Sequence, residues 1–281
     1  MKVTVIGLGL IGGSMAITLR KEGVATELFG VDRNEANAAK AVELQIVDKI
    51  LPENEALSKS DFVIVSIPVN ATAALLPSVL DAVSDHTVVI DVGSTKNLIS
   101  KAMTNHPKRM QFVASHPIAG TEYSGPTAAF HGLFEGKTNI VCEREKSSER
   151  ALATALKVFD ALKLNTIYME PQEHDKHVAY ISHLSHVSSF LLGQTVLDIE
   201  KDEKNIFDLA GSGFASTVRL AKSSPDMWAP IFEQNAEYLG QALTEYIMHL
   251  QKFQYLLMKK DSQAIHKIMT QANDIKRVLK N

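Results

Sequence analysis

The segment 115–122, with the sequence SHPIAGTE, holds the residue best suited to acid–base chemistry. It places His116 directly after the apolar run 110–114, where a strand is expected to end and an active-site loop to begin. Pro117 biases His116 towards an extended backbone, and Gly120 lets the chain turn just beyond it. Because an imidazole titrates near neutral pH, His116 is a candidate general acid or base. A lone histidine at a strand end is more often structural, so this segment alone decides nothing.

A second group of polar residues, SHLSH at 182–186, lies on a predicted helix that also carries His174 and His177. At about 100° per residue, His174 and His177 project to the opposite side of one continuous helix from His183 and His186. The four side chains therefore cannot share one ion, and no acid or cysteine set completes a site around either pair. We expect no metal, and one pair that faces a site or core while the other is solvated.

A third group, GSGFASTVR at 211–219, leads to Arg219. Small residues precede it, and Ser216 or Thr217 could cap a helix that starts there. The planar fork of an arginine suits a substrate carboxylate. The alternative is an exposed helical arginine paired with an acid such as Asp226, and the sequence around Arg219 alone favours that alternative.

A glycine-rich turn follows the first predicted strand and opens a helix. Residues 7–13, GLGLIGG, have the G-x-G-x-x-G spacing of a dinucleotide-binding turn. The first glycine permits a tight turn, the second lets the backbone approach a pyrophosphate, and the third allows close packing of helix on strand. Free N–H groups at the helix start face the anion. The predicted cofactor contacts in this turn are Gly7, Gly9, Leu10, Ile11 and Gly12.

Asp32 ends the next predicted strand, 20 residues after Gly12, where a ribose-binding acid is expected. A carboxylate there accepts hydrogen bonds from the adenosine 2′-OH and repels a 2′-phosphate, which favours NAD over NADP. The adjacent Arg33 is also a predicted cofactor contact. Because its guanidinium can tolerate a phosphate, the strictness of the preference for NAD stays open.

The elements that must position these residues alternate between strands and helices up to about residue 170. The predicted strands are 3–6, 28–31, 62–67, 87–92, 110–114, 139–142 and 166–169, and the predicted helices between them are 11–21, 35–43, 71–83, 95–104 and 148–162. This alternation predicts a Rossmann-type, doubly wound parallel sheet covered by helices on both faces. Ser66, Pro68 and the segment 91–96 then lie at carboxyl ends of strands, where ligands bind.

From Pro171 onward nearly all of the chain is predicted to be helical. The predicted helices are 171–199, 214–221, 228–259 and 262–279. Pro171 suits a first helical turn, so we place the boundary there, between a dinucleotide-binding domain at 1–170 and an all-α substrate and dimerisation domain at 171–281. The long helices carry more apolar residues than one small domain can cover, which predicts a homodimer. Trp228 fits a core or dimer interface better than a site.

Bulk properties restrict the class of protein. The chain has 281 residues, 45% hydrophobic and 22% charged, and a net charge of −3 that gives no electrostatic case for a nucleic-acid or membrane partner. A single cysteine, Cys142, excludes an intrachain disulfide framework and fits a reducing compartment. The N-terminus runs into a strand pattern rather than a signal peptide, and no apolar run approaches about 18 residues. We expect a cytoplasmic protein.

With these segments assembled, the chain resembles the prephenate/arogenate dehydrogenase family of tyrosine biosynthesis, in its monofunctional form. The match is carried by GLGLIGGS at 7–14, the Asp32 strand end, DVGSTK at 91–96, SHPIAGTEYSG at 115–125, SHLSH at 182–186 and GSGFASTVRLAKSSPDMW at 211–228. The resemblance spans nearly the whole chain in the correct order. The His116 segment combined with the SHLSH helix is much more specific than the glycine motif.

The resemblance implies NAD-dependent oxidative decarboxylation of prephenate to 4-hydroxyphenylpyruvate, or of arogenate to tyrosine. Carried over by position, His116 would bond the ring 4-hydroxyl and accept its proton as hydride leaves. Ser94 would help to hold that hydroxyl or the nicotinamide end. Arg219 would pair with a substrate carboxylate, with His186 nearby as a binding residue. Glu122 would belong to the polar network or gate of the site.

The chain departs from the family at Ser212 and Ser216, where members often have glycine and aspartate, and this puts the polar network around Arg219 in question. From a length of 281 residues we expect no fused chorismate mutase and no C-terminal regulatory domain. The choice between prephenate and arogenate and inhibition by tyrosine stay open. Two other functions stay open as well. One is a β-hydroxyacid dehydrogenase or imine reductase with Lys96 or another lysine as the catalytic group, and the other is a non-enzymatic nucleotide-sensing or assembly protein.

Overall fold

The computed structural model describes residues 1–203 and 205–278. The chain forms two compact units, Met1–Ala236 and a second that begins at Glu237. The first unit holds the sheet and every candidate site residue. The last residue of the predicted helix 262–279 lies outside the described residues, and the predicted domain boundary at residue 170 stays a prediction.

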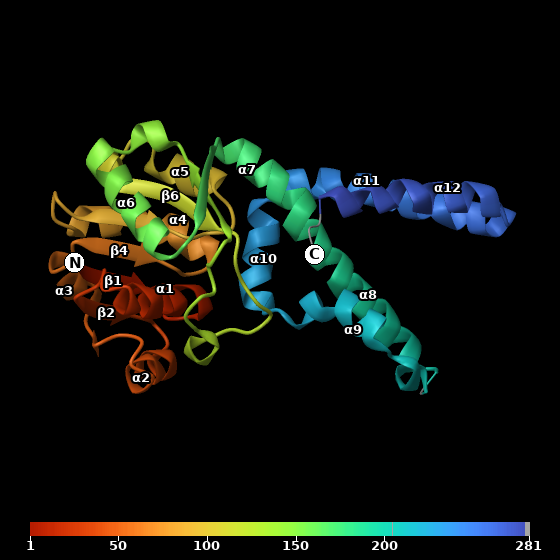
Figure 1. The fold of residues 1–281 in the computed structure, drawn as a ribbon, viewed down its shortest axis with the longest axis horizontal. Coiled ribbons are helices and arrows are strands. Elements are labelled where there is room, and N and C mark those ends of the chain that lie inside the picture. Colours follow the sequence, from red (N-terminus) through yellow and green to blue (C-terminus); the bar gives the residue numbers. More distant parts are fainter. Residues whose placement is uncertain (204, 279–281) are drawn as a thin grey trace. The chain divides into compact units, whose positions relative to one another are not determined.

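An eight-stranded sheet in the order β3-β2-β1-β4-β5-β6-β7-β8 is the framework of the first unit (Figure 1). Its strands are β1 Lys2–Ile6, β2 Glu27–Val31, β3 Lys49–Ile50, β4 Phe62–Val65, β5 Val88–Asp91, β6 Phe112–Pro117, β7 Thr138–Cys142 and β8 Asn165–Met169. The chain runs outward through β1, β2 and β3 and then returns to place β4 on the other side of β1. This reversal between β1 and β4 is where a doubly wound sheet forms its ligand crevice.

The Rossmann-type sheet followed by a helical region is confirmed, with two local differences. Strand β7 pairs antiparallel with β6, whereas the neighbouring strands from β3 to β6 are parallel and β8 is parallel to β7. A parallel pairing needs a crossover, usually a helix, and the connection from β6 to β7 carries only a 3₁₀ turn at Pro126–Ala128. Strand β3 was not predicted because two residues leave no periodic signal.

Six helices cover the two faces of the sheet: α1 Leu10–Lys21, α2 Glu35–Glu43, α3 Glu53–Ser58, α4 Val69–Ala82, α5 Asn97–Met103 and α6 Glu149–Ala161. On one face α1, α2 and α6 pack against side chains such as Val3, Val5 and Ile64. On the other face α3, α4 and α5 pack against Val63 and Val65. The central strands are buried on both faces, which fixes the carboxyl ends of β1, β4, β5 and β6 as one rigid edge.

After β8 the first unit continues as helices: α7 Pro171–Val178, α8 Leu184–Glu200, α9 Ser212–Thr217 and α10 Pro225–Gln234. A π-helical turn at Ala179–His183 joins α7 to α8, so the predicted helix 171–199 is continuous but not regular. The predicted helix start at Arg219 is wrong. Ser216 and Thr217 end α9, the Thr217 hydroxyl donates to the carbonyl of Gly213 at 2.9 Å, and Arg219 begins a 3₁₀ turn.

The second unit consists mainly of α11 Ala236–Lys259 and α12 Ser262–Ala272. The predicted helix 228–259 is therefore two helices, α10 and α11, separated at Asn235. Several large apolar side chains of α11 are exposed, including Met248, Leu257 and Met258. Within residues 1–203 and 205–278 no helix is both long and apolar enough to cross a membrane.

Candidate active site

The glycine turn after β1 is shaped by contacts that only glycine allows. Gly7 has a φ of +92°, and a Cβ there would lie 2.2 Å from the carbonyl oxygen of Ser66, at the end of β4. A Cβ on Gly12 would lie 2.2 Å from the carbonyl oxygen of Gly7. These two glycines therefore seat α1 tightly against the ends of β1 and β4.

Gly9 differs, because a Cβ there would meet nothing within 4 Å. It precedes α1 without a capping side chain, and the first turn of α1 has no acidic residue. Leu10 and Ile11 form that first turn. The open space above the start of α1, with uncompensated N–H groups facing it, fits the diphosphate of a dinucleotide.

Asp32 lies just after β2, half-buried, with each carboxylate oxygen fixed by the backbone. Oδ2 accepts from the N–H of Leu8 at 2.9 Å, and Oδ1 accepts from the N–H of Asn34 at 2.8 Å. A carboxylate has further acceptor positions, so it can still accept from a ribose hydroxyl. Arg33 is exposed, whereas Ser66 and Pro68 are half-buried after β4 on the same edge of the sheet.

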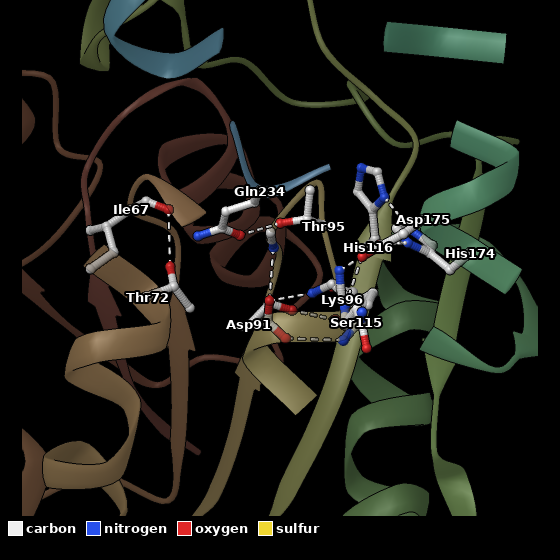
Figure 2. Close-up of polar contacts among 12 residues, drawn as sticks. Ile67, Thr72, Asp91, Thr95, Lys96, Ser115, His116, His174, Asp175 and Gln234 are labelled. Carbon is white, nitrogen blue, oxygen red and sulfur yellow. Dashed lines mark hydrogen bonds and ion pairs between the residues drawn. The ribbon is translucent and has the colours of Figure 1, made fainter. Parts of the chain in front are cut away.

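His116 is the fifth residue of β6 and makes a direct contact with the helix that follows β8. Its Nδ1 lies 2.8 Å from Nε2 of His174, and the two rings meet edge to face with centroids 5.0 Å apart. Nδ1 of His174 lies 2.7 Å from Oδ1 of Asp175. Figure 2 shows the contact between the two rings, with the second ring nitrogen of His116 pointing away from His174.

An ion pair between fully buried groups lies beneath His116. The Nζ of Lys96 donates to the carboxylate of Asp91 at the end of β5 and to the carbonyl oxygen of Ser115 at 2.8 Å (Figure 2). The Ser115 hydroxyl donates to the Asp91 carbonyl at 2.6 Å. Lys96 is 0% exposed, so its ammonium anchors the backbone next to His116 and is not presented to a substrate. Ser94 is half-buried in the same loop, which follows β5.

The surroundings of three histidines in this region lower their pKa values. Burial, with help from His174 and Lys96, keeps the pKa of His116 well below its ordinary value of 6.5. Burial also lowers the pKa of His174, against the opposing effect of Asp175, and lowers that of His183 to about 4. A neutral imidazole can accept a proton, so the environment of His116 suits a base rather than an acid.

The predicted opposition of His174 and His183 on one helix is wrong. Both are buried, 0% and 1% exposed, while His177 is exposed. The π-helical turn between them inserts one extra residue, which rotates His183 back towards the side that His174 occupies. Asn235 then bonds both segments through its Nδ2, to the Asp175 carbonyl at 2.7 Å and to His183 Nδ1 at 3.1 Å.

Arg219 lies at the other end of the site, where it is half exposed. Its Nη1 donates to Oε2 of Glu122 at 2.9 Å, and a backbone hydrogen bond together with this guanidinium lowers the pKa of Glu122. The partner is thus an acid 97 residues away and not Asp226. Ser212 and Ser216 are exposed on α9.

His186 lies against Trp228, with ring centroids 3.5 Å apart and an interplanar angle of 26°. Its Nδ1–H donates to the carbonyl of Ser182 at 3.0 Å, which leaves Nε2 as an acceptor. Trp228 is buried, and its Nε1 has no hydrogen-bond partner among the described residues. His183 lies 5.8 Å from Trp228 and 6.4 Å from Phe232, ring centre to ring centre, so it connects this stack to the His174 region.

The sequence-based prediction missed His174 and Asp175 as site residues. Trp228 lies in a small core cluster, in line with its predicted core position, and also stacks on His186. His174 was set aside because a regular helix points it away from His183, and no local signal announces a π-helical turn. Within the described part of the chain, no group of three or more histidine, cysteine, aspartate or glutamate side chains could hold a metal ion.

Comparison with known proteins decides the family. Residues 15–168 match the nucleotide-binding domain of prephenate dehydrogenase, and residues 170–271 match its dimerization domain. The chain belongs to the prephenate dehydrogenase family. It is 30% identical to the prephenate dehydrogenase of Bacillus subtilis, over 98% of this chain and 75% of that protein. It is 26% identical to the cyclohexadienyl dehydrogenase of Zymomonas mobilis, over 92% of this chain and 89% of that protein.

Solved structures of the prephenate dehydrogenase family agree over nearly the whole chain. The prephenate dehydrogenase of A. aeolicus, in complex with hydroxyphenyl propionate and NAD+, has a TM-score of 0.89 at 30% identity and covers 99% of this chain and 98% of its own. The arogenate dehydrogenase of Synechocystis has a TM-score of 0.75 at 28% identity, over 99% and 100% of the two chains. The chain is thus a dehydrogenase with a Rossmann-type nucleotide-binding domain.

Proposed function

We propose that the chain catalyses the NAD-dependent oxidative decarboxylation of prephenate to 4-hydroxyphenylpyruvate. The observation that carries this proposal is His116, held by His174 at the same edge of the sheet as the open space at Gly9. A base and a dinucleotide site on one rigid edge are the two parts that oxidation of a ring carbinol requires.

For the cofactor, the glycine turn and the first turn of α1, from Gly7 to Gly12, would take the diphosphate. Asp32 would accept from the adenosine ribose, and its charge disfavours a 2′-phosphate, which supports NAD over NADP. Ser66 and Pro68 would line the same crevice, with Arg33 at its outer rim. When bound, NAD supplies the acceptor for the hydride that leaves the substrate ring.

His116 would accept a hydrogen bond from the ring 4-hydroxyl and take its proton as the carbon–hydrogen bond breaks. Ser94 would bond the same hydroxyl or the nicotinamide end, since its loop follows β5 next to β6. Loss of CO2 makes the ring aromatic, so the residues mainly have to hold the reacting groups in place. We therefore assign two contributions to His116 and Ser94: they position the reacting groups, and His116 accepts the proton.

Arg219 would bind a substrate carboxylate through its planar fork, in exchange for Glu122. His186, stacked on Trp228, would be a substrate-binding residue near Arg219. Arogenate is the second candidate substrate, because similar proteins carry the names arogenate dehydrogenase and cyclohexadienyl dehydrogenase. We further propose a homodimer through the helices after residue 170, in line with the match to a dimerization domain.

The test measures formation of reduced cofactor with each pairing of prephenate or arogenate with NAD or NADP. Turnover should be fastest with prephenate and NAD, and the absence of turnover in all four reactions would overturn the proposal. Gly9→Ala serves as the cofactor control. Its Cβ enters the open space above α1 without touching the fold, so the variant should keep its Tm while its KM for NAD rises by about tenfold or more.

A further inference from the structure

Asp175 makes four polar contacts with residues of three elements. Its ionised carboxylate can only accept hydrogen bonds. Oδ1 accepts from the backbone N–H of Lys96 at 2.7 Å, and Oδ2 accepts from that of Asn97 at 3.0 Å, at the start of α5. The Asp175 carbonyl accepts from Asn235 at 2.7 Å. The remaining contact of the carboxylate is Nδ1 of His174 at 2.7 Å. Because an ionised carboxylate has no proton to give, His174 Nδ1 must carry the hydrogen of that bond.

The protonation of the His116–His174 contact follows from that of the His174–Asp175 contact. Burial keeps His174 neutral, so a proton on its Nδ1 leaves a lone pair on its Nε2. That lone pair faces His116 Nδ1 at 2.8 Å, and a hydrogen bond at this distance requires a proton on the His116 nitrogen. His116 therefore donates through Nδ1 and carries its own lone pair on Nε2, the nitrogen that points away from His174 (Figure 2).

We propose that the His174–Asp175 pair holds His116 in the tautomer with its proton on Nδ1, so that Nε2 is the atom that takes the proton of the substrate hydroxyl. The inference rests on the proposed function for the identity of that hydroxyl. His174 and Asp175 are 0% and 2% exposed and act through His116, which makes them positioning residues. A second consequence is that Asp175 links His116 to the start of α5, next to the loop that carries Ser94.

The proton balance during turnover is simple. The substrate O–H bond breaks as the Nε2–H bond of His116 forms, and the resulting imidazolium keeps its Nδ1–H bond to His174. The Asp175 carboxylate stabilises that charge through His174, while the Lys96 ammonium opposes it. Asp91 neutralises Lys96 across their buried ion pair. After CO2 leaves, the proton returns to the phenolate oxygen, so His116 ends each turnover neutral.

The decisive measurement is the tautomer of His116 by NMR of the full-length protein with ¹⁵N-labelled histidine rings, at pH 7.5 and with NAD present. The His116 signals are assigned by their loss in His116→Asn. We expect a protonated Nδ1 and an unprotonated Nε2. A proton on Nε2 in the unaltered protein would overturn the inference, whatever the activity assay shows. Conversely, absence of turnover with prephenate or arogenate would remove the proposed function and leave the tautomer result standing.

Two substitutions of His174 test the inference by enzyme kinetics. In His174→Gln the amide oxygen can still accept from His116, whereas His174→Leu offers no acceptor. We expect His174→Leu to lower kcat by about 100-fold with KM changed less than about twofold, the effect of losing an orienting partner. His174→Gln should restore most of kcat, and both effects should parallel the fraction of Nδ1-protonated His116. His177→Leu, on the exposed side of α7, is the matched control. Equal kcat in His174→Leu and His177→Leu would contradict the inference.

Discussion

His116 and Arg219 hold the two ends of the candidate site, and their surroundings differ in burial and in the number of bonds. Around His116 the groups that fix it, His174, Asp175 and Lys96, are almost fully buried and bonded across three elements. Arg219 is half exposed and makes one ion pair, with Glu122. The first arrangement resists change because any break leaves a buried polar group unpaired, whereas the second can exchange partners at small cost. Under the proposed function, this difference means that the site of proton transfer is preorganised and the site of substrate capture is not.

The largest expected effect comes from removing His116, the proposed base. His116→Asn keeps a polar group in β6 but has no nitrogen that can take the hydroxyl proton. We expect kcat to fall by about 10²–10⁴-fold, the usual contribution of general base catalysis, with the KM for NAD unchanged. Steady-state assays and cofactor titration measure both quantities. His177→Asn, on the exposed side of α7, is the control. A fall of less than about tenfold would mean that His116 is not the base.

The buried end of the site, which includes His183, should also make the stability of the fold depend on pH. Below about pH 6.5 an unfolded chain protonates its histidines, while burial keeps His183 neutral down to about pH 4 in the folded state. The unfolded state then binds more protons, so the free energy of unfolding should fall as the pH falls from 6.5 to 4. His183 alone accounts for about 3 kcal/mol of that loss. Urea unfolding from pH 6.5 to 4 should show that the free energy of unfolding depends less steeply on pH in His183→Asn. An unchanged pH dependence would contradict the assignment of this loss to His183.

Substitution of Arg219, at the exposed end of the site, should affect substrate binding more than the chemical step. Arg219→Ala removes a charge-assisted hydrogen bond to the substrate carboxylate, worth about 1.5–3 kcal/mol, so the KM for prephenate should rise by about 10- to 150-fold. We expect kcat to change much less. Lys222→Ala, on the same 3₁₀ turn, is the matched control for loss of positive charge. A loss confined to kcat would place Arg219 with the preorganised end and break the comparison.

The two ends also differed in how well the sequence predicted them. The glycine turn, the alternation of strands and helices, and His116 at the end of β6 follow from local patterns, because parallel strands bring their carboxyl ends to one edge. His174 could not be placed, since a calculation at 3.6 residues per turn fails across the π-helical turn at Ala179–His183. The partner of Arg219 also escaped prediction, because Glu122 is distant in sequence whereas Asp226 is near. The residues that contact His116 are fixed by tertiary contacts that no local pattern encodes.

The smallest expected effect tests whether Glu122 competes with the substrate or organises the site. If Glu122 only occupies Arg219 until a carboxylate arrives, Glu122→Gln frees the guanidinium, and the KM for prephenate should fall by up to about fivefold, the scale of an exposed ion pair. The effect should shrink in high salt, which screens the same pair. Glu135→Gln, which breaks the exposed pair with Lys163 in the β6–β7 connection, is the control. A rise in KM would instead show that Glu122 holds Arg219 in its binding position, so that the open end of the site is preorganised as well.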